Sequence, residues 1–142
     1  MERVEIPAVV YWKSKSGKKF NNQETCEKYE RLFDKWNKPS VYREIENVEG
    51  QCCYVYWVET KEDLDDLIWF IRYNKDISTC NYIEPGDKPF EPQWIVASPD
   101  YNEYNAEMAI RTLEDMRDIT EDTLKAARDT LGVIVKLLWE KV

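Results

Sequence analysis

The clearest pattern of apolar and polar positions lies near the end of the sequence, between residues 102 and 141. From Thr120 onward, apolar side chains recur in steps of three and four, which places them on one stripe of a helix. The residues of this stripe are Leu124, Ala127, Leu131, Ile134 and Leu138. Thr120 is positioned to cap the start of that helix. A shorter stripe of the same spacing precedes it, made of Ala106, Ala109, Ile110, Leu113 and Met116. The pattern therefore predicts a C-terminal pair of helices, joined near residues 118–120 as a helical hairpin or as a gently broken rod.

The first forty residues predict a hairpin followed by a helix. Residues 4–12 are rich in Val, Ile, Tyr and Trp and indicate a strand, and residues 18–20 begin its returning partner beyond Gly17. The helix follows with Asn21 as its cap and Glu24 three residues later in a capping-box arrangement. It ends at residues 37–39, and its apolar face consists of Cys26, Tyr29, Phe33 and Trp36.

The middle of the chain predicts the rest of a sheet and a second helix. Residues 51–58 are apolar on both faces, which is typical of a central strand. Thr60 caps a helix that ends near Asn74. Residues 41–48 are expected to form a strand or a loop. Short strands are expected at residues 79–83 and 93–97, and the second of these strands ends at residues 98–100. Together these elements predict a single α+β domain that spans residues 1–142. Its residues 1–100 form a small antiparallel or mixed sheet with two helices, and its residues 101–142 form the helical pair.

Composition is that of a soluble globular chain, because 43% of its 142 residues are hydrophobic and 34% are charged. No apolar run approaches the ~20 residues that a membrane-spanning helix needs. Residues 1–6 carry alternating charges and no apolar signal region. We therefore expect no membrane association and a cytoplasmic location.

Net charge is −8 and unevenly distributed, with +3 in residues 1–38 and −11 in residues 39–142. Such an acidic surface repels phosphates and favours basic partners, including proteins that themselves bind nucleic acid. It also serves solubility alone. The candidate partner-binding residues are an acidic run and two tyrosines: Glu59, Glu62, Asp63, Asp65, Asp66, Tyr101 and Tyr104. The competing interpretation is that the acidic run is a solvated helix face.

The residues needed for common catalytic chemistry are missing. The chain contains no His, and its four Gly residues do not form a phosphate-binding loop. The four Cys residues lack metal-binding spacing and are expected to be buried free thiols. We expect no catalytic, cofactor-binding or metal-binding residues and no enzymatic activity. A metal-dependent hydrolase using Asp87, Asp100 and Glu103 is the weakest alternative.

Aromatic residues suggest a second hypothesis. Several lie at expected strand ends or in loops, where they can stack on a base: Trp12, Tyr54, Trp57, Tyr82, Trp94, Tyr101 and Tyr104. Arg72 or Arg111 would then meet a phosphate. The chain would in that case sequester a signalling nucleotide. The alternative is that these rings fill the core.

One segment resembles a known group of proteins. The run Tyr11-Trp12, then Ser16-Gly17-Lys18-Lys19-Phe20, then Glu24-Thr25-Cys26-Glu27-Lys28-Tyr29-Glu30 is similar to a module of many short bacteriophage and mobile-element proteins. That module has an aromatic strand, a "DGxxF"-like turn and an "ECxxYE"-like helix, and Ser16 stands where Asp is usual. The resemblance implies a phage or mobile-element origin and identifies no active site. If a phage encodes the protein, the expected cytoplasmic location is the cytosol of the host cell. It favours a small effector that binds and inhibits a host protein, such as a CRISPR nuclease or a restriction system.

The width of the C-terminal stripe predicts self-association. Leu124, Leu131, Ile134 and Leu138 would remain exposed on a monomer unless the helix covered the sheet, and such a patch is unusual on soluble monomers. We expect a homodimer through these four residues. The alternative is a monomer whose C-terminal helix covers the sheet completely.

Overall fold

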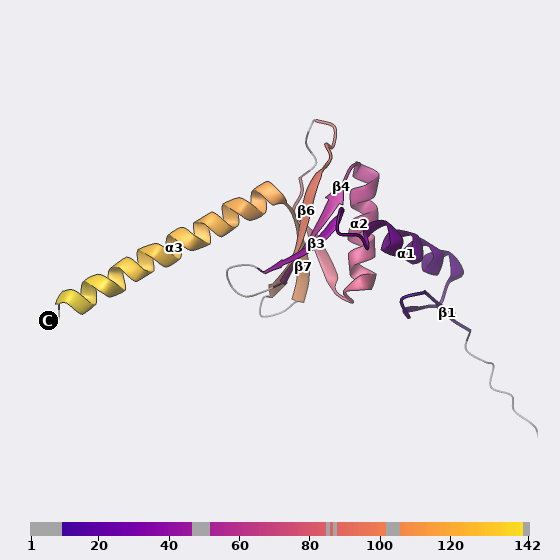
Figure 1. Ribbon diagram of the computed structural model, residues 1–142, viewed down its shortest axis with the longest axis horizontal. Coiled ribbons are helices and arrows are strands. Elements are labelled where there is room, and N and C mark those ends of the chain that lie inside the picture. The colour runs from indigo at the N-terminus through magenta and orange to yellow at the C-terminus, as the bar shows by residue number, and fades with distance from the viewer. Residues whose placement is uncertain (1–9, 47–51, 85, 87, 102–105, 141–142) are drawn as a thin grey trace, which may run out of the picture.

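The computed structural model describes residues 10–46, 52–84, 86, 88–101 and 106–140. Within these residues the chain forms a five-stranded sheet, a two-stranded hairpin and three helices. Two helices cover one face of the sheet, and the third projects away from both layers (Figure 1). The predicted α+β class and the mixed sheet are confirmed, but the predicted arrangement of the helices is not.

The five-stranded sheet has the order β3-β4-β6-β7-β5. Its strands are β3 (Tyr42–Glu46), β4 (Cys52–Val58), β5 (Ser78–Asn81), β6 (Gln93–Tyr101) and β7 (Ala106–Thr112). All neighbouring pairs are antiparallel except β5 and β7, which run parallel. As predicted, β4 has a neighbour on each side, and its apolar residues point to both faces.

Helices α1 (Gln23–Trp36) and α2 (Lys61–Asn74) form the second layer, in the positions that the sequence predicts. The side chain of Asn22, not Asn21, caps α1 by accepting from the backbone N–H groups of Glu24 and Thr25. Thr60 caps α2 as predicted. Each helix turns its apolar stripe toward the sheet, because burying that stripe supplies most of its stability.

The main core lies between this helical layer and the sheet. Its fully buried side chains come from both helices and from β4, β6 and β7: Trp36, Tyr56, Leu67, Ile71, Ile95 and Ile110. The opposite face of the sheet holds a smaller cluster of Cys53, Val55 and Val96, against which Trp94 and Met116 pack.

The hairpin consists of β1 (Trp12–Lys13) and β2 (Lys19–Phe20). Gly17 has φ +92° at its turn, a conformation that favours glycine. Phe20 is buried against Tyr29 of α1, with 5.1 Å between ring centroids. The Lys15 backbone N–H donates to Glu30 Oε1 at 2.9 Å. Of the strand predicted at residues 4–12, positions 4–9 lie outside the described residues.

The C-terminal helical pair was predicted wrongly. Residues 106–112 form β7, and α3 (Leu113–Glu140) is one continuous helix of 28 residues. In β7, Met108, Ala109 and Ile110 are all buried, so the strand shows no alternation of apolar and polar positions. The Thr120 hydroxyl donates to the Met116 carbonyl oxygen inside the helix, and the helix start is capped instead by Thr112 Oγ1, which accepts from the Asp115 N–H.

Strand β6 continues past the predicted end and includes Pro99. Proline is compatible with this position because the pairing of β6 with β4 ends at Ala97, opposite Tyr54. Beyond that point β6 pairs only with β7. The missing N–H of Pro99 therefore breaks no bond to β4.

Candidate functional site

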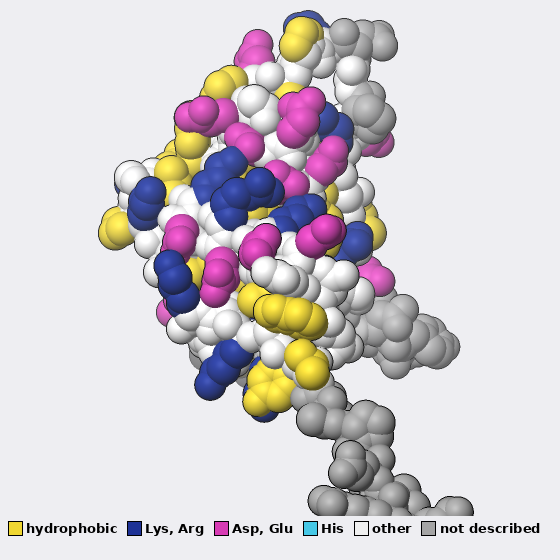
Figure 2. Space-filling model, turned by 90° about the vertical axis from the view of Figure 1, so that its right-hand side faces the viewer, with side chains coloured by type: hydrophobic (Ala, Val, Ile, Leu, Met, Phe, Trp, Pro, Cys, Tyr) yellow, Lys and Arg dark blue, Asp and Glu magenta, His cyan; other side chains and the backbone are white. Residues whose placement is uncertain are grey.

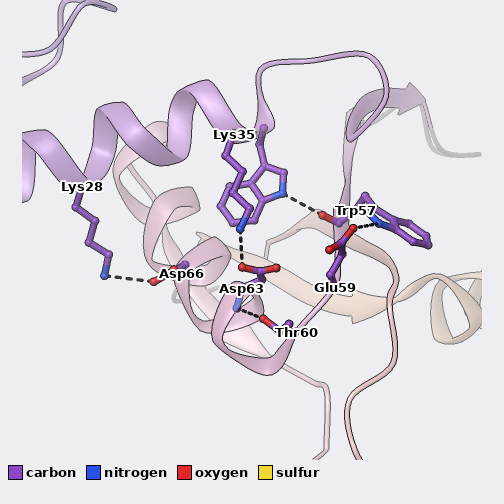
Figure 3. A network of polar contacts seen from close by, with 8 residues as sticks. Lys28, Lys35, Trp57, Glu59, Thr60, Asp63 and Asp66 are labelled. Atoms are coloured by element: carbon purple, nitrogen blue, oxygen red, sulfur yellow. Dashed lines mark hydrogen bonds and ion pairs between the residues drawn. The ribbon is translucent and has the colours of Figure 1, made fainter.

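The predicted acidic segment lies at the start of α2, facing the end of α1 (Figure 3). Lys35 Nζ donates to Asp63 Oδ1 at 2.5 Å, and Lys28 Nζ lies 3.5 Å from Asp66 Oδ1. Asp65 pairs with Lys61 one turn away at 3.2 Å. Three of the five carboxylates proposed to contact a partner therefore form ion pairs within the protein itself.

Asp63 has the most structured environment of these residues. Its backbone N–H donates to Thr60 Oγ1 at 3.1 Å, at the helix cap. Partial burial raises the pKa of the carboxyl group, but hydrogen bonding and the charge of Lys35 outweigh it, and the pKa lies below its ordinary value. Asp63 therefore stabilises the contact between α1 and α2, a role that the spacing of acidic residues along the sequence did not reveal.

The other residues predicted to bind a partner do not form a continuous acidic patch. Glu62 is exposed, and exposed Glu59 accepts from Trp57 Nε1 at 3.4 Å. The side chain of Tyr101 and the whole of Tyr104 lie outside the described residues. On the face shown in Figure 2, Lys and Arg side chains are interspersed with Asp and Glu. This face therefore presents both signs of charge.

Of the seven aromatic residues of the nucleotide hypothesis, the five whose side chains the structure describes do not converge on one pocket. Trp57 and Trp94 pack edge to face at 5.3 Å, on the side of the sheet opposite the helices. Arg111 lies over the ring of Tyr82 at 4.3 Å, and Trp12 lies in the hairpin.

A different set of rings lines a cavity of about 220 Å³ between the helical layer and the β3 edge of the sheet. Its aromatic walls are Phe33, Trp36, Tyr42, Tyr56 and Phe70, and its polar rim is Asn37, Glu44, Asn74 and Lys75. These rings were expected to be core residues or were not singled out at all. No sequence motif marks them, because they come from four separate elements.

Polar groups at this cavity have distinct electrostatics. Lys75 Nζ lies 3.8 Å from the centroid of the Tyr54 ring, and burial lowers the pKa of its ammonium group, opposed by the charge of Glu44. Tyr42 donates to Glu44 Oε1 at 2.6 Å. Burial raises the pKa values of both Tyr42 and Tyr56. Both phenols are therefore protonated at neutral pH, which suits hydrogen bonding to a ligand better than proton abstraction.

Helix α3 is the most exposed element of the described chain. Every residue from 121 to 140 is exposed, and no residue of the helix is fully buried. All four residues of the predicted dimer contact are accessible: Leu124 at 40%, Leu131 at 60%, Ile134 at 49% and Leu138 at 66%. The alternative, in which this helix covers the sheet completely, is therefore wrong. Met116 packs the start of α3 against the small cluster on the sheet.

The remaining sequence expectations concern metals, thiols and membranes. In the described ranges, no three His, Cys, Asp or Glu side chains are grouped so that they could hold a metal ion. Cys26 and Cys53 are buried as expected and Cys80 partly so, whereas Cys52 is exposed. None of the helices in the described part combines the length and the apolar character needed to cross a membrane.

Comparison with protein families, with curated proteins and with solved structures finds no match for this chain.

Proposed function

We propose that this protein is a small, non-enzymatic, phage-type effector that binds a basic surface of a host protein through α3. The observation that carries this proposal is the exposure of α3, from residue 121 to residue 140. A helix of 28 residues with so little contact to its own domain gains little stability from packing. Its sequence is better explained if it contacts another molecule.

The charges on α3 favour a basic partner. Asp115, Asp122 and Asp129 recur every seven residues and so form one acidic stripe. Asp122 and Leu124 are two residues apart, about 200° around the axis, so this acidic stripe lies opposite the apolar one. The helix carries seven Asp and Glu against four Lys and Arg. Such a stripe would speed association with a positively charged groove and repel free nucleic acid.

This proposal moves the partner-binding region away from residues 59–66. Asp63 and Asp66 pair with α1, and Asp65 pairs within α2, so binding a partner there would compete with existing contacts. The three residues of the acidic stripe are all exposed in the described part of the chain. They are available to a partner without breaking the fold.

The biological role that fits these features is anti-defence. The segment that resembles phage and mobile-element proteins favours a host target, and an acidic helix can occupy a groove that otherwise holds nucleic acid. A CRISPR nuclease or a restriction enzyme has such a groove. Inhibition would then result from occupying the groove and not from chemistry.

An affinity experiment tests the proposal. The tagged protein is incubated with nuclease-treated lysate of its bacterial host, and retained proteins are identified by mass spectrometry. The triple variant Asp115→Asn, Asp122→Asn, Asp129→Asn should lose a basic partner that the wild type retains. The control variant Glu62→Gln, Asp65→Asn should keep it. Identical retention by the triple variant, or tight binding of DNA or RNA by the protein alone at physiological salt, would contradict the proposal.

The aromatic cavity favours a second candidate, a nucleotide-sequestering protein. Its volume of about 220 Å³ accommodates a single ring system, with Lys75 at the rim to meet an anionic group. Titration with cyclic and linear nucleotides, followed by tryptophan fluorescence, tests this function. Binding that is lost in Tyr42→Ala but kept in the triple Asp→Asn variant would support it over the first candidate.

A further inference from the structure

The apolar stripe of α3 has the spacing of a coiled coil. Successive intervals of four, three, four, three and four residues separate its members, which we call the seam: Thr120, Leu124, Ala127, Leu131, Ile134 and Leu138. In heptad terms, Leu occupies the a positions and Thr, Ala and Ile the d positions. At 1.5 Å per residue, the seam runs for about 27 Å along α3.

Exposed side chains indicate that an apolar face of α3 lacks its partner. Seven large hydrophobic side chains near the end of this helix are at least 42% exposed: Leu131, Val133, Ile134, Val135, Leu137, Leu138 and Trp139. Soluble monomers rarely leave so many neighbouring apolar side chains uncovered. Among the described elements, α3 is the one that stands outside both layers (Figure 1).

The occupant that matches this face is a second copy of α3. We propose that two copies of the chain pair through their seams as a parallel, in-register coiled coil. A second copy supplies a face of the same length with the same apolar spacing, so every a and d layer contains matching residues. The proposal goes beyond the proposed function, because it uses the apolar stripe and leaves the acidic stripe exposed.

Charges and the apolar end of α3 select the parallel orientation. In a parallel pair, Thr123 lies beside Arg128 of the second copy and Thr130 beside Val135, so no like charges meet along the seam. An antiparallel pair centred on the seam would place the two Arg128 side chains together. It would also lay the apolar residues 131–139 against the acidic first half of the other helix.

The parallel pair also buries residues beside the seam. Val135 and Leu137 occupy the flanking e and g positions, and they are 42% and 56% exposed in the single chain. Gly132 and Lys136 lie on the outside. The last two turns of α3 therefore contribute most of the contact, since Leu131, Ile134 and Leu138 are there as well.

Sedimentation equilibrium of the full chain tests self-association. The wild type should sediment at twice the 17.0 kDa of one chain at micromolar concentration. Leu131→Asp places a charge in the seam and should raise the dissociation constant at least about 100-fold. Val133→Asp is the matched control, since Val133 and Leu131 are both 60% exposed but Val133 lies outside the seam. It should remain a dimer.

Two results would overturn the dimer. One is a wild type that sediments as a single chain at these concentrations. The other is loss of the near-ultraviolet circular dichroism of the folded domain in Leu131→Asp, which would mean that the stripe belongs to the domain core. If the triple Asp→Asn variant loses the host protein but remains a dimer, host binding depends on the acidic stripe and dimer formation does not. The two proposals can therefore fail independently.

Disulfide trapping tests the orientation. In a Cys52→Ser background, which removes the exposed thiol, Ala127→Cys should form a disulfide-linked dimer on mild oxidation. The control Asp129→Cys lies on the outer side of α3 and should not. Preferential cross-linking of Ala127→Cys to Leu131→Cys in a mixture of the two variants would establish an antiparallel pair and overturn the parallel one.

Discussion

Replacing Asp63 with Asn is expected to destabilise the domain, because Asp63 is structural. The substitution keeps the size of the side chain and removes its charge. It weakens the contact to Lys35 and removes a negative charge from the first turn of α2, where such a charge interacts favourably with the helix dipole. The Asp63 side chain is 21% exposed, so its interactions are partly shielded from water.

The magnitude follows from the two interactions that the substitution affects. A partly exposed ion pair contributes about 0.2–1 kcal/mol, and the 41% exposure of Lys35 places this pair in the lower half of that range. Loss of the favourable interaction between the Asp63 charge and the helix dipole adds about 0.5 kcal/mol. We therefore expect the free energy of unfolding to fall by about 1 kcal/mol. Lys35→Met combined with Asp63→Asn should give a coupling energy of about 0.5 kcal/mol.

The effect should depend on pH with a defined sign. The pKa of Asp63 is lowered in the folded state, so its contribution is present above the ordinary pKa of about 3.9 and is lost as pH falls through the folded value. The difference between wild type and Asp63→Asn should be constant from about pH 5 to 8 and should shrink below about pH 4.

Urea unfolding followed by tryptophan fluorescence measures this difference, at fixed protein concentration because association shifts apparent stability. Asp65→Asn is the control, since the Asp65 side chain is 65% exposed and pairs only along its own helix. If the two variants unfold at the same urea concentration, the Lys35 contact contributes nothing. The original assignment of Asp63 to a partner contact would then regain support.

Three further predictions concern other parts of the chain. Gly132→Ala should stabilise the protein by about 0.5–1 kcal/mol, because alanine favours a helix and the added Cβ meets no atom within 4 Å. A lower melting temperature, measured by circular dichroism, would contradict this prediction. Trp36→Phe should lower the free energy of unfolding, measured in urea, by about 2 kcal/mol, because it removes a buried indole that donates to a backbone carbonyl of β4. A decrease of less than about 0.5 kcal/mol would refute that role. Iodoacetamide should modify exposed Cys52 well before buried Cys26, as peptide mass mapping would reveal, and equal rates would mean that the core around α1 opens readily.

Local signals predicted the first half of the fold well. Caps, turn residues and apolar spacing located α1, α2, β4 and the hairpin, because each of these elements begins or ends at a residue with a strong conformational preference. The capping residue Asn22 was missed by one position, since Asn21 and Asn22 are adjacent and both suit a cap. Elements with clear boundary chemistry are those that a sequence specifies locally.

The error in β7 has a different cause. Its sequence, Ala106 to Thr112, contains good helix formers, and the spacing of Ala106, Ala109 and Ile110 fits a helix. In the folded chain the segment pairs with both β6 and β5, and a strand buried on both faces has no alternating pattern. The pattern of the segment alone therefore does not distinguish this strand from a helix, and its pairing with β6 and β5 decides the outcome.

Sequence also gave no sign of the ion pairs that the acidic segment makes within the protein. Charge density selected residues 59–66, but it contains no information about which lysines fold against them. Lys28 and Lys35 lie more than twenty residues earlier, on α1. The cavity lined by Tyr42 and Tyr56 was missed for the same reason, since its walls join elements that are separate in the chain.

The residues that carry the resemblance to phage proteins have structural roles here. Phe20, Cys26 and Tyr29 belong to the core, and Glu30 anchors the hairpin by accepting from the backbone of Lys15. A motif that is used to attach a hairpin to a helix can recur in proteins with different targets, because it fixes a scaffold and leaves the rest of the surface free. Target choice should therefore depend on elements outside residues 11–30. In this chain the described element with the most surface free for a target is α3, so exchanging α3, and not the hairpin, should transfer partner specificity between proteins that share the scaffold.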